Sequence, residues 1–104
     1  MQASTNCERR HDIDVYLNGK KLNDCIQADD IKGVAWVMYR DSKGKLVSEI
    51  DAEPGALFYE GAQVIKLNGK IEIKVRIEEG ESEAHVREVI EKTSAPIRLY
   101  FYAE

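Results

Sequence analysis

The chain has few of the residues that mark specialised protein classes. Its 104 residues include two cysteines and two prolines. Cys7 and Cys25 are too few for a disulfide scaffold and fit a reducing compartment with free thiols. The longest apolar run, residues 33–39, is too short to cross a bilayer. We therefore expect neither a disulfide-stapled miniprotein nor a helical membrane protein.

The start of the chain also lacks a recognisable signal. Residues 1–12 have no apolar core of the kind that a secretory signal needs, so we expect a cytoplasmic protein. Residues 1–10 are polar and without periodicity, which predicts a flexible N-terminal tail. Residues 11–104 are predicted to form a single domain, because a chain of this size can bury one core.

The overall composition is that of an ordinary globular protein. Apolar residues make up 43% of the chain, charged residues 33%, and the net charge is −4. A mildly acidic chain argues against a broad nucleic-acid footprint.

The tetrapeptide Leu-Asn-Gly-Lys occurs twice, at 17–20 and at 67–70. Both residues of an Asn-Gly pair tolerate positive φ, which a type I′ hairpin turn requires. In the first copy this turn places Val15 opposite Leu22. In the second copy this turn places Val64 opposite Ile73, which belongs to the regularly alternating residues 70–78. The flanks do not otherwise match, so we predict two hairpins and no internal repeat.

The remaining patterns complete a predicted α+β fold. Residues 34–39 are apolar at nearly every position, which indicates a central strand. Asp41 and Gly44 favour a turn, from which residues 46–50 return as a strand, followed by a weaker strand at 56–60. Residues 82–93 have the periodicity of a helix that Ser82 caps and Pro96 stops.

A last strand is expected at 97–102, joined through a right-handed crossover and parallel to residues 70–78 or a near neighbour. The prediction is a mainly antiparallel β-meander from residue 13 to residue 77, with one helix packed on the sheet and a final C-terminal strand. The predicted core contains Val15, Trp36, Ile73, Val75, Val86, Ile90, Leu99 and Phe101.

The sequence offers no catalytic, cofactor or metal site. Cys7, His11 and Cys25 lack the tight spacing of a structural zinc site, and neither cysteine has an activating local context. Asp29 and Asp30 are adjacent, so on a strand their carboxylates would point to opposite faces. We expect a protein that is not an enzyme, and a clustered Cys–His or carboxylate pocket would reopen the possibility of a small hydrolase.

Two surfaces could bind a macromolecule. Basic residues that alternate with aromatic ones on a sheet can bind single-stranded nucleic acid, and the candidates are Lys66, Lys70, Lys74 and Arg76. Acidic residues interrupt this row, so nucleic acid is the alternative hypothesis. The preferred one is a protein partner or a homodimer at a sheet edge, because tyrosine and arginine are enriched at interface hot spots. Its predicted contacts are Arg98, Tyr100, Tyr102 and Tyr59. The same tyrosines could instead pack against a loop or the N-terminal hairpin.

Residues 14–47 and 67–75 resemble small uncharacterised proteins that tailed bacteriophages and prophages encode. The shared pattern is an Asn-Gly turn, an acidic Ala-Asp-Asp segment, an Arg-Asp-x-x-Gly-Lys hairpin and a closing strand. The resemblance implies a phage-encoded accessory or host-interaction protein, and it carries no functional residue over to this chain.

Overall fold

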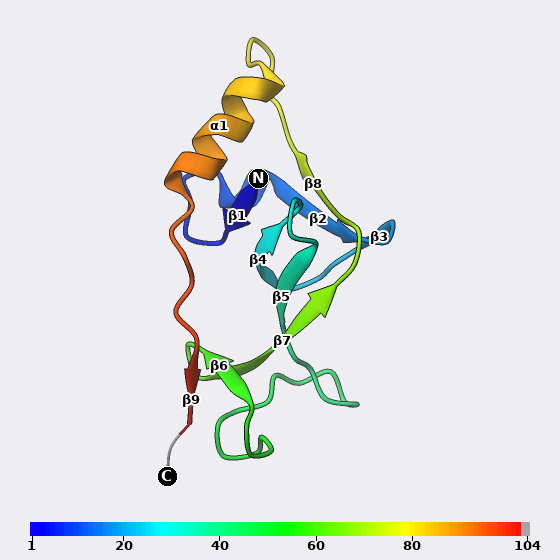
Figure 1. The fold of residues 1–104 in the computed structure, drawn as a ribbon, viewed down its shortest axis with the longest axis vertical. Coiled ribbons are helices and arrows are strands. Elements are labelled where there is room, and N and C mark those ends of the chain that lie inside the picture. Colours follow the sequence, from blue (N-terminus) through cyan, green and yellow to red (C-terminus); the bar gives the residue numbers. More distant parts are fainter. Residues whose placement is uncertain (103–104) are drawn as a thin grey trace.

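The computed structural model describes residues 1–102 of the chain. The molecule is elongated, with extents of 50 × 25 × 23 Å, and Figure 1 shows α1 at one end and β6 with β9 at the other. As predicted, the fold is α+β, with a mainly antiparallel curled sheet, one helix and a C-terminal strand. The elements are β1 (Gln2–Ser4), a 3₁₀ helix (Arg10–Asp12), β2 (Ile13–Leu17), β3 (Lys20–Lys21), β4 (Cys25–Asp29), β5 (Val34–Met38), β6 (Leu57–Tyr59), β7 (Ala62–Asn68), β8 (Ile71–Val75), α1 (Glu83–Thr93) and β9 (Tyr100–Phe101).

The strands form two sheets. The larger has six strands in the order β1-β4-β5-β7-β6-β9, and the smaller has three in the order β3-β2-β8. All paired strands are antiparallel. β5 lies between β4 and β7, which confirms the central strand predicted from its apolar sequence.

The first Leu-Asn-Gly-Lys copy is the predicted hairpin turn. Asn18 and Gly19 have φ angles of 50° and 85°, and Leu17 pairs with Lys20. The amide of Leu22 donates to the Val15 carbonyl over 2.8 Å, so these two residues lie opposite each other as expected.

The second copy does not form a hairpin, and this prediction is wrong. β7 and β8 belong to different sheets. Val64 pairs with Leu57 and Met38, whereas Ile73 pairs with Val15 on β2. The chain therefore passes from one sheet to the other at residues 68–71, and the second Asn-Gly pair marks this crossing.

Contact between the two copies explains the difference. The Asn18 amide donates to the Lys70 carbonyl over 2.8 Å, and the Lys70 amide donates to Asn18 Oδ1 over 2.9 Å. A Cβ atom at Gly69 would lie 2.7 Å from Leu17 Cδ1. The second glycine thus permits a close approach between chain segments, and long-range pairing with β2 replaces the local turn.

Between β5 and β6, residues 39–50 match the prediction only in their turn, whereas the weaker strand expected at 56–60 is present as β6. Asp41 Oδ1 accepts from the amides of Lys43 and Lys45, and Gly44 has a φ of 78°. Residues 46–50 form no strand; they contribute only the bridges Arg40–Leu46 and Ser48–Ala62. These few pairings leave residues 46–50 as a loop rather than the expected strand.

The helix is confirmed. It spans Glu83–Thr93, and the Ser82 hydroxyl accepts from the His85 amide over 3.1 Å as an N-cap. Val86 and Ile90 are fully buried. They meet residues of both sheets in the larger hydrophobic cluster, which consists of Ala3, Val15, Ala28, Ala35, Ile71, Ile73, Val86 and Ile90.

A smaller cluster covers the opposite face of the six-stranded sheet. It contains Ile26, Tyr59 and Val64, with partly buried Trp36, Met38, Leu57, Ile97 and Leu99 around them. Ala35 and Trp36 follow each other in β5 and therefore point to opposite faces. Of the predicted core, Val15, Ile73, Val86 and Ile90 are buried, whereas Phe101 is 66% exposed and lies outside both clusters.

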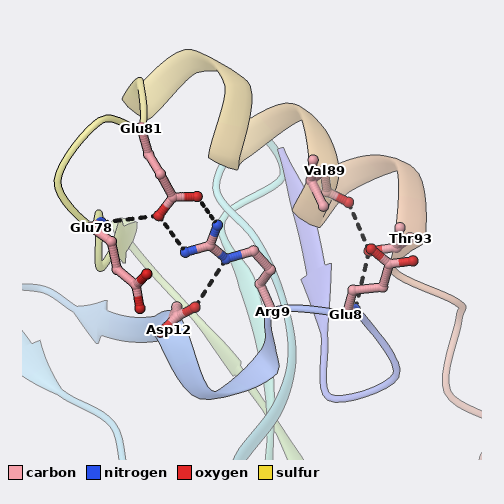
Figure 2. Close-up of polar contacts among 7 residues, drawn as sticks. All are labelled: Glu8, Arg9, Asp12, Glu78, Glu81, Val89 and Thr93. Atoms are coloured by element: carbon pink, nitrogen blue, oxygen red, sulfur yellow. Dashed lines mark hydrogen bonds and ion pairs between the residues drawn. The ribbon is translucent and has the colours of Figure 1, made fainter.

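The N-terminal residues are not the predicted flexible tail. β1 pairs with β4, and Ala3 and Ser4 are buried. Figure 2 shows the contacts that hold the following residues to the helix region. The Arg9 guanidinium donates to both carboxylate oxygens of Glu81 and to Asp12 Oδ2, the last over 2.9 Å. Long-range partners of this kind are invisible to local periodicity.

The end of the chain differs from the predicted crossover. β9 spans only Tyr100–Phe101 and pairs antiparallel with β6. Residues 94–99 connect α1 to β9 along one side of the molecule (Figure 1). We call residues 94–99 the strap. Because the strap is extended along the sheet, the last strand reaches the far edge instead of lying beside β8.

Candidate protein-binding edge

β9 is the last strand at one edge of the six-stranded sheet. Its register places Tyr100 opposite Phe58 and Phe101 opposite Leu57 on β6. Within residues 1–102 no strand pairs with its other side. The structure therefore places the C-terminal strand at a sheet edge, where backbone groups can pair with an added strand.

The Tyr100 side chain connects β9 to neighbouring segments of the chain. Its hydroxyl donates to Glu49 Oε1 and accepts from the Gly61 amide over 3.0 Å. Its ring lies 5.8 Å from the Phe58 ring. The hydrogen bond to the Glu49 carboxylate raises the pKa of Tyr100 above its ordinary value. Of the predicted contacts, Tyr100 thus has a structural role alongside its exposed position.

Beside β9 lies a cleft that the sequence did not indicate. It has a volume of about 330 Å³ between β9 and the 49–56 loop. Phe101, Tyr102 and Ile50 line it and are 66%, 46% and 86% exposed. Buried Phe58 contributes to its wall. Three exposed large apolar side chains beside one cleft are unusual for a surface that only faces water.

The cleft is acidic. Glu49 and Glu53 are among its lining residues, which include no lysine or arginine in the described part of the chain, residues 1–102. A binding segment with basic side chains would therefore meet complementary charge. Together with Phe101 and Tyr102, the two carboxylates could hold an apolar side chain flanked by cations.

The other predicted contacts divide between surface and core. Arg98 is exposed on the strap next to β9. Tyr59 is only 9% exposed and packs against Ile26 and Val64, so it belongs to the smaller cluster and not to the exposed surface beside β9. The sequence did not indicate that Phe101 lines a cleft, because the alternation of residues 97–102 assigned Phe101 to the core. It did not indicate the exposed Ile50 either, because Ile50 lies in a loop without any periodic signal.

The four basic residues of the alternative hypothesis do not share one face. Lys66 is on β7 of the larger sheet, Lys74 is on β8 of the smaller sheet, and Lys70 lies between these strands. Arg76 follows β8. Lys74 pairs in register with Asp14, and its amine lies 4.4 Å from the centre of the Tyr16 ring. A single basic row across one sheet is therefore absent from residues 1–102.

The cysteines have no activated setting. Both are free and partly buried. Burial raises the pKa of the Cys25 thiol to about 11, which keeps it protonated and poorly nucleophilic at neutral pH. Among residues 1–102, no three histidine, cysteine, aspartate or glutamate side chains are grouped so that they could hold a metal ion.

No protein-family model, curated protein or solved structure matches the chain. In the described part of the chain, no helix has the length and apolar character needed to span a membrane.

Proposed function

We propose that the chain is a non-catalytic interaction protein that captures an extended segment of a protein partner at β9. The observation that carries this proposal is the edge of β9, which no strand within residues 1–102 pairs, beside the cleft lined by Phe101, Tyr102 and Ile50. Backbone pairing along the edge would supply affinity, and the cleft would select a side chain of the partner.

The chemistry of the partner follows from the lining. An aromatic or aliphatic residue would contact Phe101 and Tyr102, and a neighbouring lysine or arginine would face Glu49 and Glu53. Aromatic anchors in a partly enclosed pocket commonly dominate interface energetics. The partner segment is thus apolar and basic.

The proposal of a non-catalytic protein rests on the buried thiol of Cys25, whose pKa is raised to about 11 by burial, which makes it a poor nucleophile at neutral pH. Cytoplasmic location and phage or prophage origin are proposals too. The first is supported by the two free cysteines, Cys7 and Cys25, which fit a reducing compartment, and the second by the resemblance of residues 14–47 and 67–75.

Selection from a random peptide display library tests the proposal. Peptides selected on the purified protein should carry an aromatic or aliphatic residue next to lysine or arginine. The double variant Phe101→Ser, Tyr102→Ser should weaken their binding at least about 10-fold, as expected when interface anchors are removed. Isothermal titration calorimetry with the best selected peptide gives the affinities.

Ile31→Ser is the matched control, because Ile31 is 84% exposed in the turn between β4 and β5, away from the cleft. It should bind the peptide like the unmodified protein. Selected peptides that bind the double variant equally well would place the site elsewhere. Self-association that the double variant abolishes would replace the basic partner with a second copy of the chain, and sedimentation equilibrium measures it.

A further inference from the structure

A second surface of the six-stranded sheet carries the single tryptophan of the chain. Trp36 on β5 pairs in register with Gln27 on β4 and with Lys66 on β7. Residues paired in this way present their side chains on the same face. An amide, an indole and an ammonium group therefore form one row across three strands.

The row borders a hollow of about 210 Å³. Trp36, Gln27 and Lys66 line it together with Gln2, Asp29 and Lys32. Trp36 is partly buried against the smaller cluster, so one part of the indole is anchored while another part faces the hollow. The site thus combines a planar aromatic surface with two cations.

The turn between β4 and β5 holds Lys32 at this hollow. Asp29 Oδ1 accepts from the amides of Ile31 and Lys32, both over 2.9 Å. Gly33 follows with a φ of 67°, and a Cβ atom there would lie 2.6 Å from the Gly69 carbonyl oxygen. These contacts fix the backbone of the turn, and Asp29, the carboxylate that lines the hollow among residues 1–102, accepts both amide hydrogen bonds at Oδ1.

Gln27 is fixed as well. Its Oε1 accepts from the Ile97 amide of the strap over 3.0 Å. This bond orients the side-chain amide, whose NH₂ group donates no hydrogen bond within residues 1–102. An acceptor on a planar ligand could use that group.

We propose that this hollow binds a nucleobase that stacks on Trp36, with its phosphate held by Lys32 and Lys66. Stacking on aromatic side chains tolerates any base because every base has a π-face, and lysine ammonium groups attract phosphate. The base could belong to a free nucleotide or to a single strand. The site is separate from β9, so it is independent of the proposed protein partner.

Tryptophan fluorescence reports on this site alone, because Trp36 is the only tryptophan. Uridine 5′-monophosphate should quench it saturably, and uridine without phosphate should bind more weakly. Lys32→Gln and Lys66→Gln should each raise the dissociation constant about 1.5- to 5-fold, the range of an exposed ion pair. Lys74→Gln, on the other sheet, is the control and should change nothing.

A uridine oligonucleotide distinguishes the two sources of the base. Much tighter binding of the oligonucleotide indicates a single strand, and equal binding indicates a free nucleotide; either outcome supports the base site. The absence of saturable quenching by both probes would overturn the proposal. Quenching that neither Lys32→Gln nor Lys66→Gln weakens would also overturn it.

Discussion

The two edges of the six-stranded sheet differ in whether another segment of the chain covers them. At β1 the strap covers the edge: the Ser4 hydroxyl donates to the Ala95 carbonyl over 2.6 Å, and the Ala95 amide donates to the Asn6 carbonyl over 3.0 Å. At β9, within residues 1–102, no segment beyond β6 pairs with the strand, and Phe101 is 66% exposed. Natural sheets usually protect their edges, so the open edge is the one that suggests binding.

The covered edge also carries the helix. α1 packs on β1 and β8, and Val86 and Ile90 have no exposed surface. The open edge instead has apolar side chains in water. One edge therefore contributes to folding stability, whereas the other leaves apolar area exposed.

The largest expected effect is a difference in the free energy of unfolding between variants at the two edges. Ile90→Ala should lower the free energy of unfolding by about 2–5 kcal/mol, because it leaves a cavity in a packed core. Phe101→Ala should change it by less than about 0.5 kcal/mol, as is usual for exposed positions. Urea unfolding followed by circular dichroism measures both.

Equal losses of stability in the two variants would contradict the comparison, because Phe101 would then pack in a core. Val89→Ala serves as a control for helix propensity: it changes α1 at a partly exposed position and should cost less than Ile90→Ala.

A smaller effect concerns the clasp of Arg9 and Glu81 near the covered edge (Figure 2). The hydrogen bond from Arg9 and the backbone amide of Glu78 lower the pKa of Glu81 from 4.5 to about 2. A carboxylate with a lowered folded-state pKa stabilises the fold above its unfolded pKa, and this contribution disappears as the pH falls. Stability should therefore decline between about pH 4.5 and pH 2, and part of this decline should come from Glu81.

Glu81→Gln should flatten the pH dependence of the midpoint of urea unfolding in that window. Glu79→Gln, an exposed neighbour in the same loop, should leave it unchanged. The same slope in Glu81→Gln as in the unmodified protein would show that the clasp does not form in solution.

Local signals predicted the local features of this fold. The Asn18-Gly19 turn, the Ser82 cap and the apolar central strand depend on neighbouring residues, and the structure contains each of them. The second Asn-Gly pair has the same letters but lies where β7 crosses to the other sheet. Its conformation is decided by contact with Leu17 and Asn18, which are distant in the sequence.

The candidate site shows the same division. An edge position of the C-terminal strand was one of two interpretations of its sequence, beside a crossover next to residues 70–78, and Arg98 and Tyr102 are exposed. Alternation placed Phe101 inside because it assumes that a helix covers one face of every strand, and α1 packs on β1 and β8 instead. Tyr59 was assigned to the surface by residue type, although its partners Ile26 and Val64 bury it.

Backbone amide hydrogen exchange by NMR, with and without the best peptide from the library selection, tests the central claim most directly. The account predicts slow exchange at the covered β1 edge in both states and faster exchange along residues 100–102 in the free protein. Bound peptide should then protect amides within residues 100–102 and leave residues 2–4 unchanged. Peptide-induced protection at residues 2–4, or none within residues 100–102, would contradict the claim that β9 is the binding edge.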